Sequence, residues 1–174
     1  MRHDEKAGPT RLHRLDHWLY RGGRPNRLAR AINRVWATVF AAGVLQPDRM
    51  VTLQVPGRRT GRVISFPLVV ADYQGERYLV AMLGQNTNWV HNVRAAGGRA
   101  VLRHGRSEAV RLDEVDTGAR APILRRYLAC SPGGRTHLPV APQAPLEEFE
   151  RVAAEYPVFR ITPDRSAAPP ASGR

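Results

Sequence analysis

The chain has 174 residues, of which 43% are hydrophobic and 24% charged, a balance typical of a globular protein with one core rather than a disordered chain. Its single cysteine, Cys130, excludes an intramolecular disulfide and favours a reducing, cytoplasmic location. No apolar run is long enough for a membrane-spanning helix, and the first residues lack a signal-peptide pattern.

The chain is strongly basic: it has 27 Lys and Arg but only 15 Asp and Glu, which gives a formal net charge of +12. Lys6 is the only lysine. A GC-rich genome explains the preference for arginine but not the net charge, since such a genome also supplies Asp and Glu. The excess indicates an acidic partner such as a phosphate, a polycarboxylate or an anionic membrane. Nucleic acid is disfavoured, because aromatic residues do not alternate with the arginines as a stacking platform requires.

The ends of the chain are polar, and we expect a disordered leader over residues 1–10 and a disordered tail over residues 164–174. One domain is expected between them, over residues 11–163. Residues 27–44 place apolar side chains at helical spacing with arginines off the stripe, which predicts an amphipathic helix with a basic start. We expect this helix to pack on the domain, with peripheral contact to an anionic membrane as the alternative.

From Met50 onward the apolar spacing becomes that of β-strands. Strands are expected over residues 50–55, 63–71, 77–83, 99–103, 109–115 and 158–162. Pro67 marks the second as an edge strand or a bulge. The segments Tyr73–Glu76 and His104–Gly105 have turn chemistry and predict two hairpins.

Helices are expected over residues 86–96, 117–130 and 146–156, with a Pro/Gly-rich loop at 131–145. The strands come in hairpins, with helices between the hairpins rather than after every strand. This order argues against a doubly wound parallel sheet. The predicted fold class is therefore α+β, an antiparallel β-barrel with peripheral helices.

The strongest local signal is the run Gly57-Arg58-Arg59-Thr60-Gly61-Arg62 between two apolar strands. Its glycines allow backbone N–H groups to approach an anion, and its arginines and threonine add further donors. It is not a Walker loop, which has a lysine and leads into a helix. The run predicts a cradle for a phosphate or carboxylate, and a solvated basic turn is the alternative.

A second signal lies where Gly84 ends the strand at 77–83 and the helix at 86–96 begins. Such a junction presents free N–H groups and a helix N-terminus to a bound anion. Trp89 and Asn92 are three residues apart and share one face of this helix. As an alternative, Trp89 is only a core residue.

Taken in order, these motifs resemble the deazaflavin-dependent nitroreductase family, the quinone and nitro-compound reductases of actinobacteria. The resemblance runs from about Val51 to Val101 and rests on Gly57, Arg58, Arg59, Thr60, Gly61, Pro67, Leu68, Gly75, Trp89, Asn92, Arg94 and Ala95. It implies a split β-barrel that uses coenzyme F420, an 8-hydroxy-5-deazaflavin with a phosphate and a polyglutamate tail. The implied reaction is hydride transfer to a quinone, a nitro compound or an enone. The alternatives are an FMN-dependent oxidoreductase on the same fold, or a non-catalytic protein that binds deazaflavin or nucleic acid.

The resemblance also implies where the cofactor binds. The loop arginines and Thr60 would hold the phosphate and the start of the tail. The turn from Ala81 to Gly84 would lie against the deazaflavin ring, and Trp89 and Asn92 would help to close the ring pocket. The full set of expected cofactor-binding residues is Arg58, Arg59, Thr60, Gly61, Arg62, Pro67, Ala81, Met82, Leu83, Gly84, Trp89 and Asn92.

The sequence departs from the family pattern at three points. Ile64, Ser65 and Phe66 stand where an arginine usually precedes Pro67, Gly84 replaces a common lysine, and the loop after the helix at 117–130 lacks the family's tyrosines. No catalytic proton donor can therefore be named. We expect a small electrophilic substrate such as a lipid quinone, no metal site, and a monomer or a homodimer.

Overall fold

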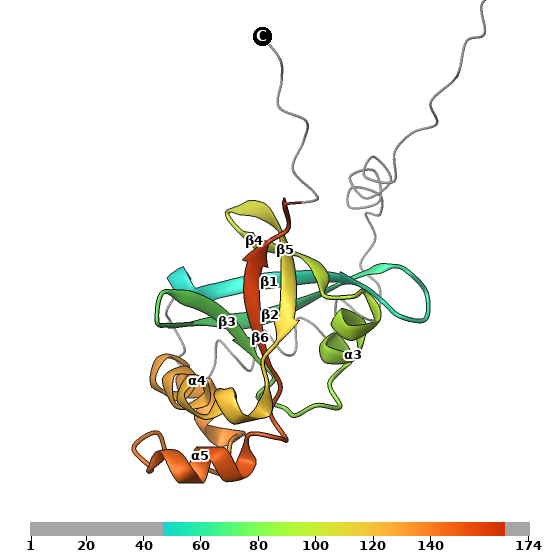
Figure 1. The fold of residues 1–174 in the computed structure, drawn as a ribbon. Coiled ribbons are helices and arrows are strands. Elements are labelled where there is room, and N and C mark those ends of the chain that lie inside the picture. Colours follow the sequence, from blue (N-terminus) through green and yellow to red (C-terminus); the bar gives the residue numbers. More distant parts are fainter. Residues whose placement is uncertain (1–46, 166–174) are drawn as a thin grey trace, which may run out of the picture.

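The computed structural model describes residues 47–165, so the predicted leader, the helix at 27–44 and the tail from residue 166 onward lie outside the described residues. Six antiparallel strands close into a barrel in the order β1-β2-β3-β6-β5-β4 (Figure 1). The strands are β1 (Met50–Pro56), β2 (Val63–Tyr73), β3 (Glu76–Val80), β4 (Arg99–His104), β5 (Arg106–Glu114) and β6 (Val158–Pro163). The predicted α+β antiparallel barrel is confirmed.

Helices lie around the barrel rather than between its strands. They are η1 (Pro47–Arg49), α3 (Asn88–Ala95), α4 (Thr117–Cys130), η2 (Pro132–Thr136) and α5 (Leu146–Val152). In Figure 1, α4 and α5 lie next to each other, away from the end of the barrel where α3 meets the loop between β1 and β2. None of the described helices is long and apolar enough to cross a membrane.

Both predicted hairpins are confirmed. Gln74 and Gly75 between β2 and β3 have φ of 51° and 81°, as the two central residues of a type I′ turn require. His104 and Arg106 pair across Gly105, whose φ is 71°. Both turns therefore depend on the left-handed backbone that glycine adopts without steric cost.

Some element ends differ from the predictions. The strand predicted at 77–83 ends at Val80, because the next residue opposite it is Pro157, which accepts from the N–H of Ala81 but has no N–H to donate back. Gly84 then turns the chain with φ of 85°. The helix predicted at 86–96 begins at Asn88, and the one predicted at 146–156 ends at Val152.

Strand β2 has two different halves. Its residues Val63–Val69 pair with β1, whereas Val70–Tyr73 pair with β3. Among the described strands, the first half therefore has a neighbour on one side only. Pro67 lies in this half, opposite Thr52. A proline has no N–H for a ladder, so the predicted edge position is confirmed.

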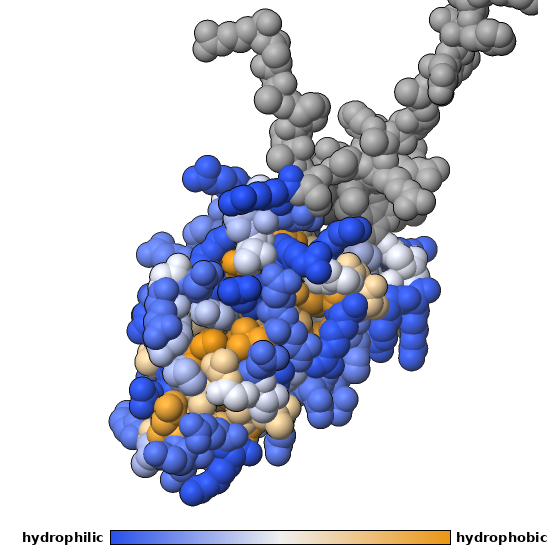
Figure 2. Space-filling view, viewed as in Figure 1, coloured by the Kyte–Doolittle hydropathy of each residue, from blue (hydrophilic) through white to orange (hydrophobic). Residues whose placement is uncertain are grey.

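Two apolar cores stabilise the domain. The barrel interior contains residues from all six strands and from α3, with Leu53, Val90 and Val110 completely buried. The second core lies between α4, α5 and the outer face of β2 and β3, around Leu124 and Phe149. Figure 2 shows a mostly hydrophilic face on which apolar residues surface in small, separate areas. The burial of both cores fixes α3 on one side of the barrel and α4 on another.

Candidate cofactor site

The loop between β1 and β2 is a compact turn. The N–H of Gly57 donates to the carbonyl of Arg62 at 2.7 Å, and the N–H of Gly61 donates back to Gly57 at 2.8 Å. A Cβ on Gly57 would lie 2.8 Å from Cδ1 of Ile64, and Gly61 has φ of 66°. The two glycines of the motif are thus required by close packing at one position and by left-handed backbone at the other.

Most backbone amides of this loop are already hydrogen-bonded, either to Asn92 or within the loop itself. The N–H of Arg58 donates to Oδ1 of Asn92 at 3.2 Å. The N–H of Thr60 donates to the carbonyl of Gly57, and that of Arg62 to Oγ1 of Thr60. The prediction that the loop offers an anion its backbone amides is wrong for these residues and for the two glycines. Within residues 47–165 the amide of Arg59 alone in this loop makes no hydrogen bond, so an anion at the loop would be bound mainly by side chains.

Arg58 fastens the loop to α3. Its Nη1 donates to Oδ1 of Asn92 at 3.3 Å and to Oδ1 of Asn88 at 3.4 Å. Asn92 is 2% exposed, and a buried amide oxygen is normally hydrogen-bonded. The structure thus brings the two sequence motifs together, and Asn92 accepts from both the backbone and the side chain of Arg58.

Arg59 and Arg62 are the free cations of the loop. Both residues are exposed, and within residues 47–165 neither guanidinium group makes a hydrogen bond or an ion pair. Thr60 is also exposed, and its hydroxyl accepts from Arg62 while keeping its own proton to donate. These three side chains fit a phosphate or a carboxylate, the acidic groups that the sequence predicted.

The segment Ala81–Gly84 forms the turn that joins β3 to α3. Besides the bond from Ala81 to Pro157 at 2.9 Å, the N–H of Gln85 donates to the carbonyl of Glu155 at 3.1 Å. Leu83 is 61% exposed, whereas Ala81 is buried. The backbone of the turn is thus held at both ends, and its middle faces solvent.

Thr87 lies between this turn and the helix. It is the N-cap residue of α3, but its hydroxyl makes no cap bond. Within the described residues, its Oγ1 is a buried side-chain oxygen with no partner. Because buried hydroxyls are almost always hydrogen-bonded, this atom fits a site for a polar group of a ligand.

Trp89 points into the barrel. Its side chain is 6% exposed and belongs to the interior core, where its ring centroid lies 5.3 Å from that of Phe159. Packing in the core is thus its observed role, and contact with a cofactor stays a prediction. Pro67 is half-buried on β2, and its contact with a cofactor likewise stays a prediction.

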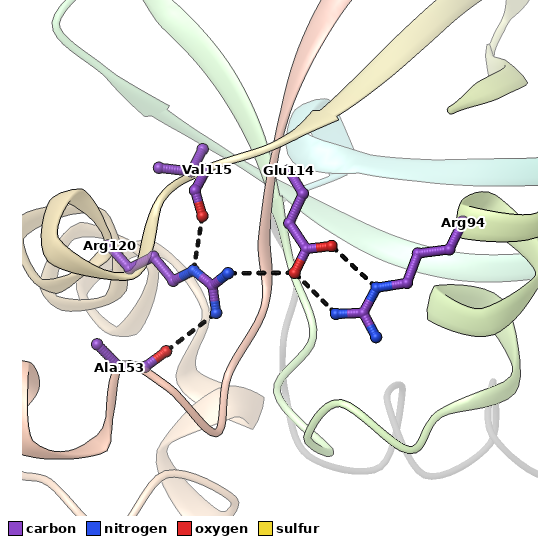
Figure 3. Close-up of polar contacts among 5 residues, drawn as sticks. All are labelled: Arg94, Glu114, Val115, Arg120 and Ala153. Atoms are coloured by element: carbon purple, nitrogen blue, oxygen red, sulfur yellow. Dashed lines mark hydrogen bonds and ion pairs between the residues drawn. The ribbon is translucent and has the colours of Figure 1, made fainter. Parts of the chain in front are cut away.

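An ion network connects α3 to α4 (Figure 3). Arg94 donates to both oxygens of Glu114 at 2.9 and 2.7 Å, and the buried Arg120 donates to the same carboxylate at 3.1 Å. Arg120 also donates to the carbonyls of Val115 and Ala153. The hydrogen bond from Arg94 holds the pKa of Glu114 below its ordinary value. No local pattern predicted this network, because its members lie on three elements that meet only in the folded chain.

Comparison with known protein families identifies the chain. The family model described as F420H2-dependent quinone reductase matches residues 28–134, which is more than half of the sequence. The chain belongs to this family. Its membership confirms the predicted class, an oxidoreductase enzyme, and the predicted cofactor, coenzyme F420. The matched segment includes the Gly57–Arg62 loop, the turn at Ala81–Gly84 and α3.

Several solved structures are similar to the chain at low sequence identity. A protein of unknown function from Agrobacterium tumefaciens is 15% identical with a TM-score of 0.51, over 74% of this chain and 54% of that one. An F420-H2 dependent reductase, FDR-A, is 16% identical with a TM-score of 0.46, over 66% and 94%. An FAD-binding protein from Mesorhizobium loti is 18% identical with a TM-score of 0.45, over 73% and 89%. No curated protein matches the sequence.

Proposed function

We propose that this oxidoreductase reduces a small electrophilic acceptor, with a quinone as the first candidate and nitro compounds and enones as further ones. Family membership supports the quinone. The observation that carries the binding mode is the pair of free cations, Arg59 and Arg62, on a loop that Asn92 holds in place. When bound, the reduced deazaflavin supplies a hydride to the acceptor.

The residues of the site divide into two groups by their contacts. Arg59, Arg62 and the hydroxyl of Thr60 would bind the phosphate and the first carboxylates of the tail through charge-assisted hydrogen bonds. Arg58 and Asn92 would act indirectly, since their polar groups bind each other and keep the loop against α3. Such a fixed loop limits the entropy lost when a charged cofactor binds.

The ring would lie against the Ala81–Gly84 turn, whose middle is exposed and whose ends are fixed. The Thr87 hydroxyl would bind a polar edge of the ring or of the adjoining chain, which would give this buried oxygen its missing partner. These residues orient the ring and keep water from one of its faces. Precise orientation matters, because small misplacements of reacting groups can cost about 100-fold in rate.

The proposal is tested by titrating the protein in parallel with coenzyme F420, with FMN, and with the deazaflavin chromophore that lacks the phosphate and the tail. We expect coenzyme F420 to bind most tightly and to weaken as salt rises, since exposed charges are screened over about 10 Å at 0.1 M salt. The truncated chromophore should bind weakly and with little salt dependence. Tighter binding of FMN than of coenzyme F420 would favour the FMN alternative instead.

Turnover separates an enzyme from a protein that only binds the cofactor. Reduced F420 is mixed with a quinone, a nitro compound or an enone, and the reappearance of oxidised cofactor is followed by absorbance. We expect the quinone to be reduced fastest. Tight binding of F420 without turnover of any of the three acceptors would refute the proposed reaction and leave a binding protein. Sedimentation of the same samples decides between the predicted monomer and homodimer.

A further inference from the structure

The hydroxyl of Tyr127, on α4, reaches the turn between β3 and α3. It donates a hydrogen bond to Sδ of Met82 at 3.1 Å, across 45 positions of sequence. Tyr127 is 2% exposed and belongs to the core between α4, α5 and the barrel. A thioether is a weak acceptor, so this bond contributes less to stability than to the direction in which the Met82 side chain points.

The ring of Tyr127 is itself held in place by its neighbours. A Cβ on Gly134, in η2, would lie 2.6 Å from Cε1 of the ring and 3.4 Å from its Cζ. Any side chain at this position would therefore displace the ring. Gly134 is buried with Tyr127, so η2 packs closely against the ring.

The backbone bonds of the turn join it to itself, to β3 and to the segment before β6, but none of them reaches α4, since the N–H of Met82 donates to Val80 and that of Gly84 to Ala81. The N–H of Ala81 donates to Pro157, and that of Gln85 to Glu155. Between them, Leu83 is exposed to solvent, whereas Met82 is half-buried and packs against the helical core. The side chain of Met82 is thus the link between the middle of the turn and α4.

We propose that Tyr127 is a positioning residue of the active site, which fixes the Ala81–Gly84 turn through Met82 and so sets the surface on which the deazaflavin ring lies. The inference rests on the proposed function for the role of the turn. Burial raises the pKa of Tyr127 to about 12, so its hydroxyl stays protonated and donates throughout the physiological range. Because this hydroxyl is buried and already donates to Met82, the residue acts through Met82.

Tyr127→Phe removes only the hydroxyl, and Tyr73→Phe, which makes the same change at the end of β2, is the control. The hydroxyl of Tyr73 accepts a hydrogen bond from Nε2 of Gln74 at 3.3 Å, in the hairpin between β2 and β3. Hydrogen exchange measured by mass spectrometry on the protein without cofactor should show about two- to tenfold faster exchange over residues 81–87 in Tyr127→Phe. The control should leave this segment unchanged.

Catalysis gives a second measurement. With coenzyme F420 bound, Tyr127→Phe should shift the absorbance band of the ring and lower kcat by about 10- to 100-fold, with a smaller change in KM for the acceptor. Met82→Leu keeps the side-chain volume but removes the acceptor atom, so it should reproduce the effect. If the two residues act through one bond, the double variant should be no worse than either single variant.

The outcomes separate this inference from the proposed function. Equal exchange over residues 81–87 in the two tyrosine variants, or equal kcat, overturns the positioning role of Tyr127. If the wild-type protein binds no deazaflavin, the proposed function fails. The exchange comparison alone then decides whether Tyr127 anchors the turn.

Discussion

Arg59→Ala gives the sharpest test of the cofactor site. Arg59 is exposed, and its guanidinium group has no partner within residues 47–165, so its removal should leave the free energy of unfolding within about 0.5 kcal/mol of wild type. A charge-assisted hydrogen bond to the phosphate or tail is worth about 1.5–3 kcal/mol. The dissociation constant for coenzyme F420 should therefore rise by about tenfold to more than 100-fold.

Two further arginine variants serve as comparisons for Arg59→Ala. Arg58→Ala removes the bonds from the guanidinium group to Asn88 and Asn92, so it should lower the melting temperature as well as the affinity. Arg106→Ala, at the start of β5, removes a charge of the same sign from an exposed position outside the loop. It should change neither affinity nor stability by a measurable amount.

The assay is a fluorescence titration of each variant with coenzyme F420 at low and high salt, with thermal melts of the same samples. The loss in Arg59→Ala should shrink at high salt, because screening already weakens the wild-type contact. Equal losses in Arg59→Ala and Arg106→Ala would refute the reasoning. Such a result would mean that the general positive field, and not the loop, attracts the cofactor.

Three other predictions concern the groups around the loop. Asn92→Ala leaves Arg58 without its buried acceptor and should cost about 1–3 kcal/mol of unfolding free energy, measured by denaturant titration. Trp89→Ala should cost about 3–5 kcal/mol because it opens a cavity in the barrel, and normal turnover of the folded variant would show that Trp89 is only core. The pKa of Glu114 is lower in the folded protein than its ordinary value. The ionised carboxylate therefore adds to the free energy of unfolding above the ordinary carboxyl pKa, and this stabilisation is lost as pH falls through the lowered pKa. Melting temperatures of wild type and Glu114→Gln should therefore differ at neutral pH and converge in acid, and a constant difference would contradict this origin.

Sequence patterns predicted the elements because these depend on local chemistry. Alternating apolar residues predicted β1 and β4, the Gln74-Gly75 pair predicted a hairpin, and Pro67 predicted an edge. The end of β3 was predicted three residues too late. The apolar run continues to Leu83, but Ala81 lies opposite Pro157, which has no N–H to extend the ladder, and no local pattern reveals this pairing.

The sequence predicted a position for the candidate site, which stays a prediction, but it could not predict which polar groups of the site bind each other. The motif with two glycines and three arginines indicated anion binding, and the family match supports that function. The sequence could not show which groups of the loop are already engaged. In the structure, Oδ1 of Asn92 accepts hydrogen bonds from both the backbone N–H and the guanidinium group of Arg58. The guanidinium groups of Arg59 and Arg62 make no hydrogen bond or ion pair within residues 47–165.

The sequence alone determined the class of the protein, because family motifs, turn residues and apolar spacing are properties of neighbouring residues. The tertiary structure decided which polar groups meet. Arg94, Glu114 and Arg120 come from three elements, and Tyr127 reaches Met82 across 45 positions. Such pairs depend on how the barrel closes and where α4 packs, and that packing is set by the burial of whole apolar faces rather than by any single residue.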